Sequence, residues 1–295
     1  MKPSLLLQYA LPHRLLSGLV YRATRWSWRP WKNFLIRQIS QRYQVNLDEA
    51  QHTELDAFPH FNAFFTRSLK PEARVPDPSS DVILQPADGI ISQAGEIQEG
   101  RIFQAKGHDF SVSELIADTN QANIYTRGSF ATIYLSPKDY HRVHMPMTGR
   151  LLETVHIPGR LFSVAPFTVA GIPRLFARNE RLICHFDGGV AGQFVVALVG
   201  AMLVSSIETV WGGLEIPPYA NTITRRNYRG QNRVLRQFDE LGRFNMGSTV
   251  IVLFTPAAVM LEPKLKPGMS VQVGEKLGQI VNSAPIYSSH LHSPL

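Results

Sequence analysis

Hydrophobic positions recur at two different spacings along the chain, and the change of spacing divides the sequence in two. After Pro12, apolar side chains recur three or four positions apart, as on one face of a helix. Beyond about residue 80, short runs rich in Val, Ile, Phe and Tyr alternate with Gly and Pro, which is typical of strands joined by turns. These runs are residues 90–91, 130–135, 161–164, 182–186, 194–204 and 249–254. We therefore predict an α+β fold with a helical N-terminal segment, residues 1–58, and a β-rich domain, residues 59–295.

Three shorter segments refine this prediction. The sequence Asn46-Leu47-Asp48-Glu49 resembles a capping box and predicts a short helix, and residues 61–69 carry a second helical apolar stripe. The proline-rich residues 71–78 cannot continue a helix and are expected to cross the surface into the β-rich domain. Residues 267–278 alternate apolar and polar positions around spaced glycines, like the hammerhead-like half of biotinyl and lipoyl carriers. The carriers' lysine hairpin is missing, so we expect the shape without the carrier function.

The charge of the protein is concentrated at its N-terminus. Residues 1–45 carry eight basic side chains and no acidic one, whereas the whole chain has 30 basic and 23 acidic residues. The remainder is therefore close to neutral, and nucleic-acid binding by the whole chain loses its main support. Trp26, Trp28 and Trp31 are three of the four tryptophans and lie in this same segment. A basic amphipathic helix with aromatic anchors predicts binding to an anionic membrane surface; the alternative is a helical hairpin packed on its own domain with a solvated basic face.

Other classes of protein find little support in the sequence. The apolar run near the N-terminus is short and is ended by Pro12, and we expect no secretory signal there. The longest apolar run, residues 194–204, is too short to span a bilayer and is typical of a buried strand. Cys184 is the single cysteine, so an intrachain disulfide is excluded, and its apolar neighbours predict an inert buried thiol.

Three elements could carry chemistry, and each is weak alone. Asp88 lies in a Pro-Ala-Asp-Gly sequence, which is also a common turn. His141 and His144 stand three residues apart in a segment expected to be a loop, and would suit acid–base or metal chemistry. Gly247 precedes Ser248, and a glycine allows unusual backbone angles that bring a serine hydroxyl towards the preceding carbonyl. Such an attack needs a base and an acid that orients it, which His144 and Asp88 could supply.

Taken together, these elements resemble the bacterial, membrane-associated phosphatidylserine decarboxylases. The resemblance runs from about residue 61 to residue 280, and its specificity comes from the joint order and spacing of several blocks. Those blocks are Phe61–Leu69, Pro86–Gly89, Lys106–Gly107, Asp139–His144, Leu175–Arg181, Val199–Ala201 and Gly247–Thr249. The chain has Met246 where the family usually has Leu, and Ser205 where it tends to have Gly. Leu to Met keeps size and apolarity, so we expect cleavage to be retained.

The resemblance implies a proenzyme that cuts itself between Gly247 and Ser248. The products would be a large chain, residues 1–247, and a small chain, residues 248–295, which stay associated as a heterodimer and could pair further as a dimer. Ser248 would become a covalent pyruvoyl cofactor, which forms a Schiff base with phosphatidylserine and yields phosphatidylethanolamine and CO2. The resemblance further implies that Asp88, His144 and Ser248 form the charge relay for cleavage.

His141 is then the candidate proton donor in decarboxylation, although the two histidines could exchange roles. No metal is implied. The expected location is the cytoplasmic face of the bacterial cell membrane, as a peripheral protein. A metal-dependent hydrolase that uses His141 and His144 with His290 and His292 is the alternative from another class, and a membrane-tethered carrier module is a weaker one.

Overall fold

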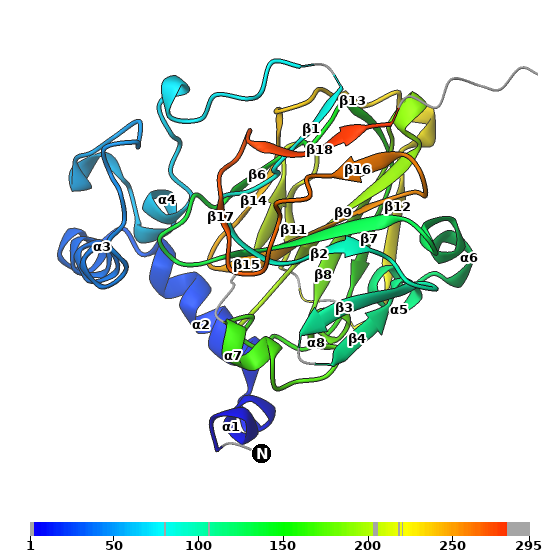
Figure 1. Cartoon of the computed structure of the whole chain (residues 1–295). Helices are drawn as coiled ribbons and strands as arrows, with labels where there is room; N and C mark the ends of the chain where they lie inside the picture. Colours follow the sequence, from blue (N-terminus) through cyan, green and yellow to red (C-terminus); the bar gives the residue numbers. More distant parts are fainter. Residues whose placement is uncertain are drawn as a thin grey trace, which may run out of the picture.

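Three N-terminal helices, a set of antiparallel sheets and several short helices make up the described part of the computed structural model (Figure 1). The structure describes residues 3–79, 81–105, 107–202, 206–217, 219 and 221–281. Helices α1 (Pro3–Ala10), α2 (His13–Arg25) and α3 (Arg29–Tyr43) lie together on one side of the sheets. The predicted α+β class is confirmed.

The largest sheet has nine strands and runs through the centre of the molecule. Eight strands follow one another in the order β12-β7-β8-β9-β15-β5-β2-β17, and β13 pairs beside them with β7. Every pairing in this sheet is antiparallel. In the order of the sheet, its strands are β12 (Thr224–Asn227), β7 (Gly149–Ile157), β8 (Arg181–Asp187), β9 (Gln193–Val199), β15 (Ser248–Phe254), β5 (Ser129–Leu135), β2 (Gly89–Glu96) and β17 (Ser270–Val271), with β13 (Val234–Leu235).

Three smaller sheets surround this one. A four-stranded sheet has the order β11 (Gly213–Ile216), β10 (Ile207–Thr209), β14 (Glu240–Phe244) and β6 (Arg142–His144). A three-stranded sheet joins β1 (Val82–Leu84), β18 (Lys276–Ile280) and β16 (Val259–Leu261), and β3 (Arg101–Ala105) pairs with β4 (His108–Ser111). Residues 245–247 connect β14 of the four-stranded sheet to β15 of the main sheet. The predicted cleavage segment is therefore the link between two sheets.

Short helices fill the remaining connections. The α-helices are α4 (Phe61–Phe65), α5 (Val112–Ile116), α6 (Thr119–Ala122), α7 (Pro166–Val169) and α8 (Leu175–Arg178). The 3-10 turns are Leu55–Ala57, Pro71–Ala73, Asn123–Tyr125, Gly189–Ala191 and Arg229–Gln231. Helix α4 begins after His60, whose ring nitrogen accepts a hydrogen bond from the Ala63 N–H, and it confirms the helix expected after residue 60.

Two apolar cores lie on opposite faces of the central strands. Along β15, Val250 and Val252 belong to one core, and Ile251 and Leu253 belong to the other. Strands buried on both faces have continuous apolar sequences, which explains the unbroken runs in residues 182–186 and 249–254. Cys184 is fully buried in β8, and burial raises the pKa of its thiol, as expected for an inert cysteine.

Two predicted elements are wrong. Residues 46–49 form turns, and the Asn46 side chain accepts a hydrogen bond from the Asp48 N–H, so the asparagine closes a local turn instead of capping a helix. Residues 161–164 are not a strand. The buried Asn179 amide bonds both the N–H and the C=O of Phe162, at 3.0 and 2.9 Å, and this side chain takes the place of a neighbouring strand.

Two further boundaries differ from the prediction. The strand expected over residues 194–204 ends at Val199, where Asn179 also donates to the Gly200 carbonyl oxygen. Residues 142–144, expected in a loop, form strand β6 because they pair with β14. The C-terminal strands β17 and β18 belong to different sheets, and the hammerhead-like form of this part stays a prediction.

Helix α2 contacts the β-rich domain through polar positions. The buried positions of α2 are His13, Ser17 and Thr24, whereas Leu15 and Leu19 are 64% and 53% exposed. The apolar stripe predicted from the sequence therefore faces away from the protein. Among the described residues, no helix has the length and apolar content needed to cross a membrane.

Helix α3 is anchored more conventionally. Ile36 is fully buried and packs in one cluster with the phenylalanines of and around α4, which are Phe58, Phe61, Phe64 and Phe65. This cluster fixes the helices to the part of the protein that covers His141, since the Phe65 ring lies 4.0 Å from the His141 ring, centroid to centroid.

Candidate active site

Ser248 is the first residue of β15 and lies in the interior. Its Cα is paired with that of Leu135 in β5, and its side chain is fully buried. Among the described residues, no hydrogen-bond partner lies within reach of the Ser248 Oγ. A buried hydroxyl without a partner is costly in a structural role, and it is free to act as a nucleophile.

The backbone before Ser248 has one unusual residue. We expected unusual angles at Gly247, but the φ of +139° belongs to Met246, and Gly247 is outside the positive-φ set. A side chain with a Cβ rarely adopts such an angle, and conformations of this kind cost on the order of 1–3 kcal/mol each. A Cβ added at Gly247 would be 3.5 Å from the Leu135 carbonyl oxygen and 4.0 Å from the His141 Nε2, which is ordinary contact. The strain therefore lies one residue before the predicted cleavage bond.

His141 presents a ring nitrogen to this segment. Its Nδ1 lies 2.8 Å from the Asp139 carbonyl oxygen, and because a carbonyl can only accept, Nδ1 carries the proton. The Nε2 atom is then a free acceptor, buried and without a hydrogen-bond partner among the described residues. Burial lowers the pKa of His141 to about 3, so the ring is neutral. His141 therefore presents a neutral imidazole with an open lone pair near Gly247, and it is not hydrogen-bonded to the Ser248 hydroxyl in this structure.

His144 is engaged elsewhere. Its Nδ1 donates to the Phe238 carbonyl oxygen at 2.7 Å, and its Nε2 accepts from the Tyr140 hydroxyl at 3.1 Å. Burial lowers the pKa of this ring as well. The backbone N–H of His144 bonds the Pro86 carbonyl oxygen at 2.8 Å, so the segment lies beside the Pro-Ala-Asp-Gly turn.

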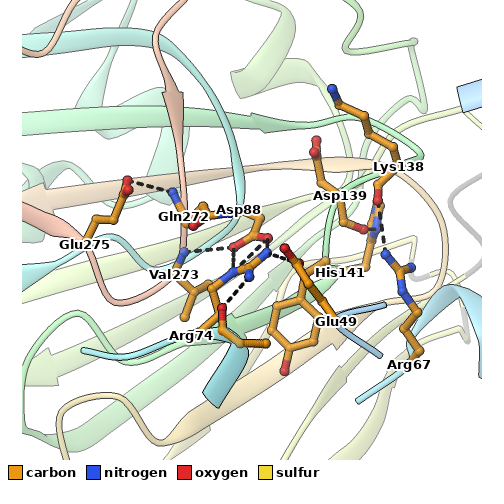
Figure 2. Close-up of polar contacts among 12 residues, drawn as sticks. Glu49, Arg67, Arg74, Asp88, Lys138, Asp139, His141, Gln272, Val273 and Glu275 are labelled. Carbon is orange, nitrogen blue, oxygen red and sulfur yellow. Dashed lines mark hydrogen bonds and ion pairs between the residues drawn. The ribbon is translucent and has the colours of Figure 1, made fainter. Parts of the chain in front are cut away.

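Asp88 is held by a charged partner from the proline-rich connection (Figure 2). The Arg74 guanidinium bonds both carboxylate oxygens, with Nε at 3.0 and 3.2 Å, and also pairs with Glu49 at 2.9 Å. The Val273 N–H donates to the same carboxylate at 2.8 Å. Both charged side chains of this pair are nearly buried.

The structure thus separates the four predicted residues into two groups. It brings His141 near Gly247, the residue before Ser248. It places Asp88 and His144 on adjacent segments, but the hydrogen bonds of their side chains go to other residues. His290 and His292 lie outside the described residues, and within those that are described no group of three or more His, Cys, Asp or Glu side chains could hold a metal ion.

Comparison with known proteins identifies the family of the chain. The family model described as phosphatidylserine decarboxylase matches residues 61–279, which include Asp88, His141, His144, Gly247 and Ser248. The chain belongs to the phosphatidylserine decarboxylase family. A second model, described as PSD, matches residues 3–44, which contain α1, α2 and α3.

Curated relatives cover nearly the whole length of this family member. It is 55% identical over 271 residues to a protein of Xylella fastidiosa (strain M12), with 92% of each chain covered. It is 56% identical over 274 residues to a protein of Xanthomonas euvesicatoria pv. vesicatoria (strain 85-10), with 92% of this chain and 97% of the relative covered. Both relatives are named phosphatidylserine decarboxylase proenzyme.

Sequence reasoning missed several residues of this site in the phosphatidylserine decarboxylase fold. Arg74 lies in a proline-rich stretch that looked like a surface connection, although its side chain is nearly buried against Asp88. Tyr140 and Phe65 stood inside the quoted blocks, but nothing in their spacing showed that they contact His144 and His141. No sequence signal distinguished Arg74, because charged residues are common in surface connections.

Proposed function

We propose that this member of the phosphatidylserine decarboxylase family cuts itself between Gly247 and Ser248, and then converts phosphatidylserine to phosphatidylethanolamine and CO2. One observation carries the proposal. The buried Ser248 hydroxyl has no partner among the described residues, and the free Nε2 of His141 lies beside Gly247. A buried nucleophile without a partner, directly after Met246 with its strained angle, suits attack by a side chain on its own backbone, and the neutral His141 ring nearby suits the later proton transfer.

The proposed cleavage balances without any added oxidant. The Ser248 Oγ attacks the Gly247 carbonyl carbon, and the peptide becomes an ester as its nitrogen becomes the amine of Ser248. Loss of the Ser248 α-proton then breaks the Cβ–Oγ bond, which leaves a Gly247 carboxylate and a dehydroalanine. The dehydroalanine tautomerises to an imine, and one water hydrolyses it to the pyruvoyl group and ammonia.

For the base in this cleavage we keep the Asp88–His144 pair. Its support is the adjacency of the two segments through the Pro86 carbonyl, together with the burial of Asp88 and the partial burial of His144. The proposal requires His144 to leave Phe238 and Tyr140, and Asp88 to exchange a bond to Arg74 for one to the ring. His141 already faces the bond, and it is the competing base that the variants below distinguish from His144.

After cleavage, the residue at position 248 is where substrate must react. A pyruvoyl group supplies an electron sink for the carbanion left when CO2 departs. The burial of Ser248 and the neutral His141 ring near it fit such a group, because burial limits the access of water to this position. We assign His141 the return of a proton to Cα, since its Nε2 is the ring nitrogen near this position; because Nε2 carries no proton here, it would first take one from the substrate's ammonium group.

The two chains are expected to stay together after cleavage. The small chain would begin with β15, which lies between β9 and β5 in the middle of the main sheet. Seven residues of this strand are buried, so the small chain cannot leave without opening both apolar cores.

We also propose that the enzyme binds to a membrane surface through α2 and the turn that follows it. Leu15, Leu19 and Trp26 are all more than half exposed, and Trp26 stacks on the exposed Trp28 at 5.3 Å. A hairpin packed on its own domain would bury these apolar side chains, whereas the buried residues of α2 are the polar His13, Ser17 and Thr24. The basic side chains of residues 1–45 favour an anionic leaflet, and a single buried thiol suits the cytoplasmic side.

A pair of serine variants tests the proposed cleavage. Ser248→Ala should remain one uncut chain without decarboxylase activity, because no nucleophile is left. Ser248→Cys keeps a nucleophile of similar size and should still be cut, more slowly, at the same bond. If Ser248→Ala is cut at the wild-type rate, the proposed reaction is wrong.

A further inference from the structure

Asn245 lies two residues before the proposed cleavage bond and is held by three side chains from two other segments, residue 62 and residues 206–208. Its Nδ2 donates to the Ser206 Oγ and, at 2.9 Å, to the Glu208 Oε1. Its Oδ1 accepts from the Asn62 Nδ2 at 2.7 Å. The backbone N–H of Asn245 also donates to the Ser206 carbonyl oxygen at 2.9 Å, and the residue is fully buried.

Two arginines extend this network. The Arg25 Nη2 of helix α2 lies 3.2 Å from the Ser206 Oγ and 3.8 Å from the Glu208 Oε1. The Arg243 Nε lies 3.3 Å from the other carboxylate oxygen of Glu208. Glu208 is thus oriented by two cations while it accepts from Asn245. The membrane-binding helix proposed above is in this way connected to the residue that leads into the cleavage segment.

The chain on the other side of the bond is held as firmly. Ser248 pairs with Leu135 at the start of a continuous antiparallel ladder. Between the two fixed points lie only Met246 and Gly247, and Met246 has the φ of +139°. If Asn245 were released, this angle could relax, and the Gly247 carbonyl would move relative to the Ser248 hydroxyl.

We propose that Asn245 is a positioning residue for self-cleavage, held in place by Asn62, Ser206 and the arginine-bound Glu208. This inference rests on the proposed cleavage at Gly247 and Ser248. An attack by one atom on another depends steeply on their relative placement, and a displacement of about 1 Å can lower a rate on the order of 100-fold. We therefore expect Asn245→Ala to slow cleavage at least tenfold.

A double-variant cycle separates positioning from folding. In Asn245→Asp, a carboxylate replaces the donor that faces Glu208, so cleavage should slow at least tenfold. Adding Glu208→Gln supplies a donor from the other side, and the double variant should recover to within about threefold of wild type. Glu208→Gln alone keeps an acceptor for Asn245 but weakens the pairs with Arg25 and Arg243, so it should slow cleavage by no more than about threefold.

The measurement is the first-order rate constant for appearance of the small chain, followed by intact mass from the time of synthesis, together with the thermal midpoint of each variant. A purely structural role would make the rate follow the midpoint. Recovery of the rate in the double variant supports the proposal. Wild-type rates in Asn245→Ala and Asn245→Asp would overturn it, as would a double variant that folds like wild type but stays slow.

Two outcomes must be kept apart. If the wild-type protein is not cut between Gly247 and Ser248, the proposed function fails, regardless of the cleavage rates of the Asn245 variants. If wild type is cut and the Asn245 variants are cut equally fast, only the positioning role fails.

A matched pair of variants on α2 extends the test. Arg25→Met should slow cleavage severalfold, whereas Arg22→Met, on the exposed face of the same helix, should not. Equal rates for the two would show that α2 does not contribute.

Discussion

Asp88 has two possible roles, and a single substitution cannot separate them. In the proposal it orients His144 for cleavage, and in the structure it is the partner of Arg74. The Asp88 and Arg74 side chains are only 7% and 9% exposed. Removing one partner of a buried ion pair costs about 3–5 kcal/mol, because the remaining charge has lost its counter-charge.

The expected cost of Asp88→Asn lies near the lower end of that range. Arg74 keeps Glu49 at 2.9 Å, and the asparagine oxygen can still accept from the Val273 N–H. We therefore expect a loss of about 3 kcal/mol, against a total stability of about 5–15 kcal/mol for a typical domain. Chemical unfolding in a Ser248→Ala background measures this on a chain that stays whole.

The double variant Asp88→Asn with Arg74→Met removes both charges, and the methionine keeps most of the aliphatic length of the arginine side chain. Its stability should return to within about 1 kcal/mol of the parent, since replacing a whole buried pair is often nearly neutral. With Ser248 present, its cleavage should remain at least about 100-fold slow, because no carboxylate orients the base. A stable double variant that cleaves at the wild-type rate would show that Asp88 serves only as the partner of Arg74.

Three further predictions follow from particular contacts. His144→Ala should stay uncut, whereas His141→Ala should be cut but decarboxylate poorly; on intact mass and turnover, the reverse pattern would make the His141 geometry the cleavage geometry. Full-length protein should float with anionic vesicles more strongly than Leu15→Ser/Leu19→Ser, with binding weakened but not abolished by salt; equal flotation would show that another surface binds lipid. Burial lowers the pKa of His185 to about 4, so between pH 6.5 and 4 the unfolded state binds a proton that the folded state does not, and the free energy of unfolding falls as the pH falls. His185→Leu should therefore reduce the pH dependence of the free energy of unfolding in this range by up to about 1.4 kcal/mol per pH unit. An unchanged pH dependence would mean that this ring titrates normally.

The class of fold and the central strands could be predicted because burial on both faces leaves continuous apolar runs. Residues 182–186 and 249–254 are such runs, and both are strands. Residues 161–164 have the same composition, but the Asn179 side chain, distant in sequence, bonds Phe162 in place of a strand. Local pattern cannot show a partner of that kind.

The site divides in the same way. Reactive residue types and their order along the chain indicated Ser248, the two histidines and Asp88, because the chemistry needs those groups. Which ring nitrogen faces the cleavage bond depends on hydrogen bonds to Asp139 and Phe238, which are backbone carbonyls that any residue would offer. The direction of the apolar face of α2 was equally invisible, because a helical stripe has the same spacing whether it meets protein or lipid.

Intact mass of the purified wild-type protein tests the central claim most directly. The account predicts two chains, one ending at Gly247 and one beginning at position 248, the latter with a pyruvoyl group in place of its N-terminal serine. The mass of the second chain should therefore be lower than that of residues 248–295 by the difference between serine and pyruvoyl. A single uncut chain with full decarboxylase activity, or a small chain that begins with an unmodified serine and is active, would contradict it.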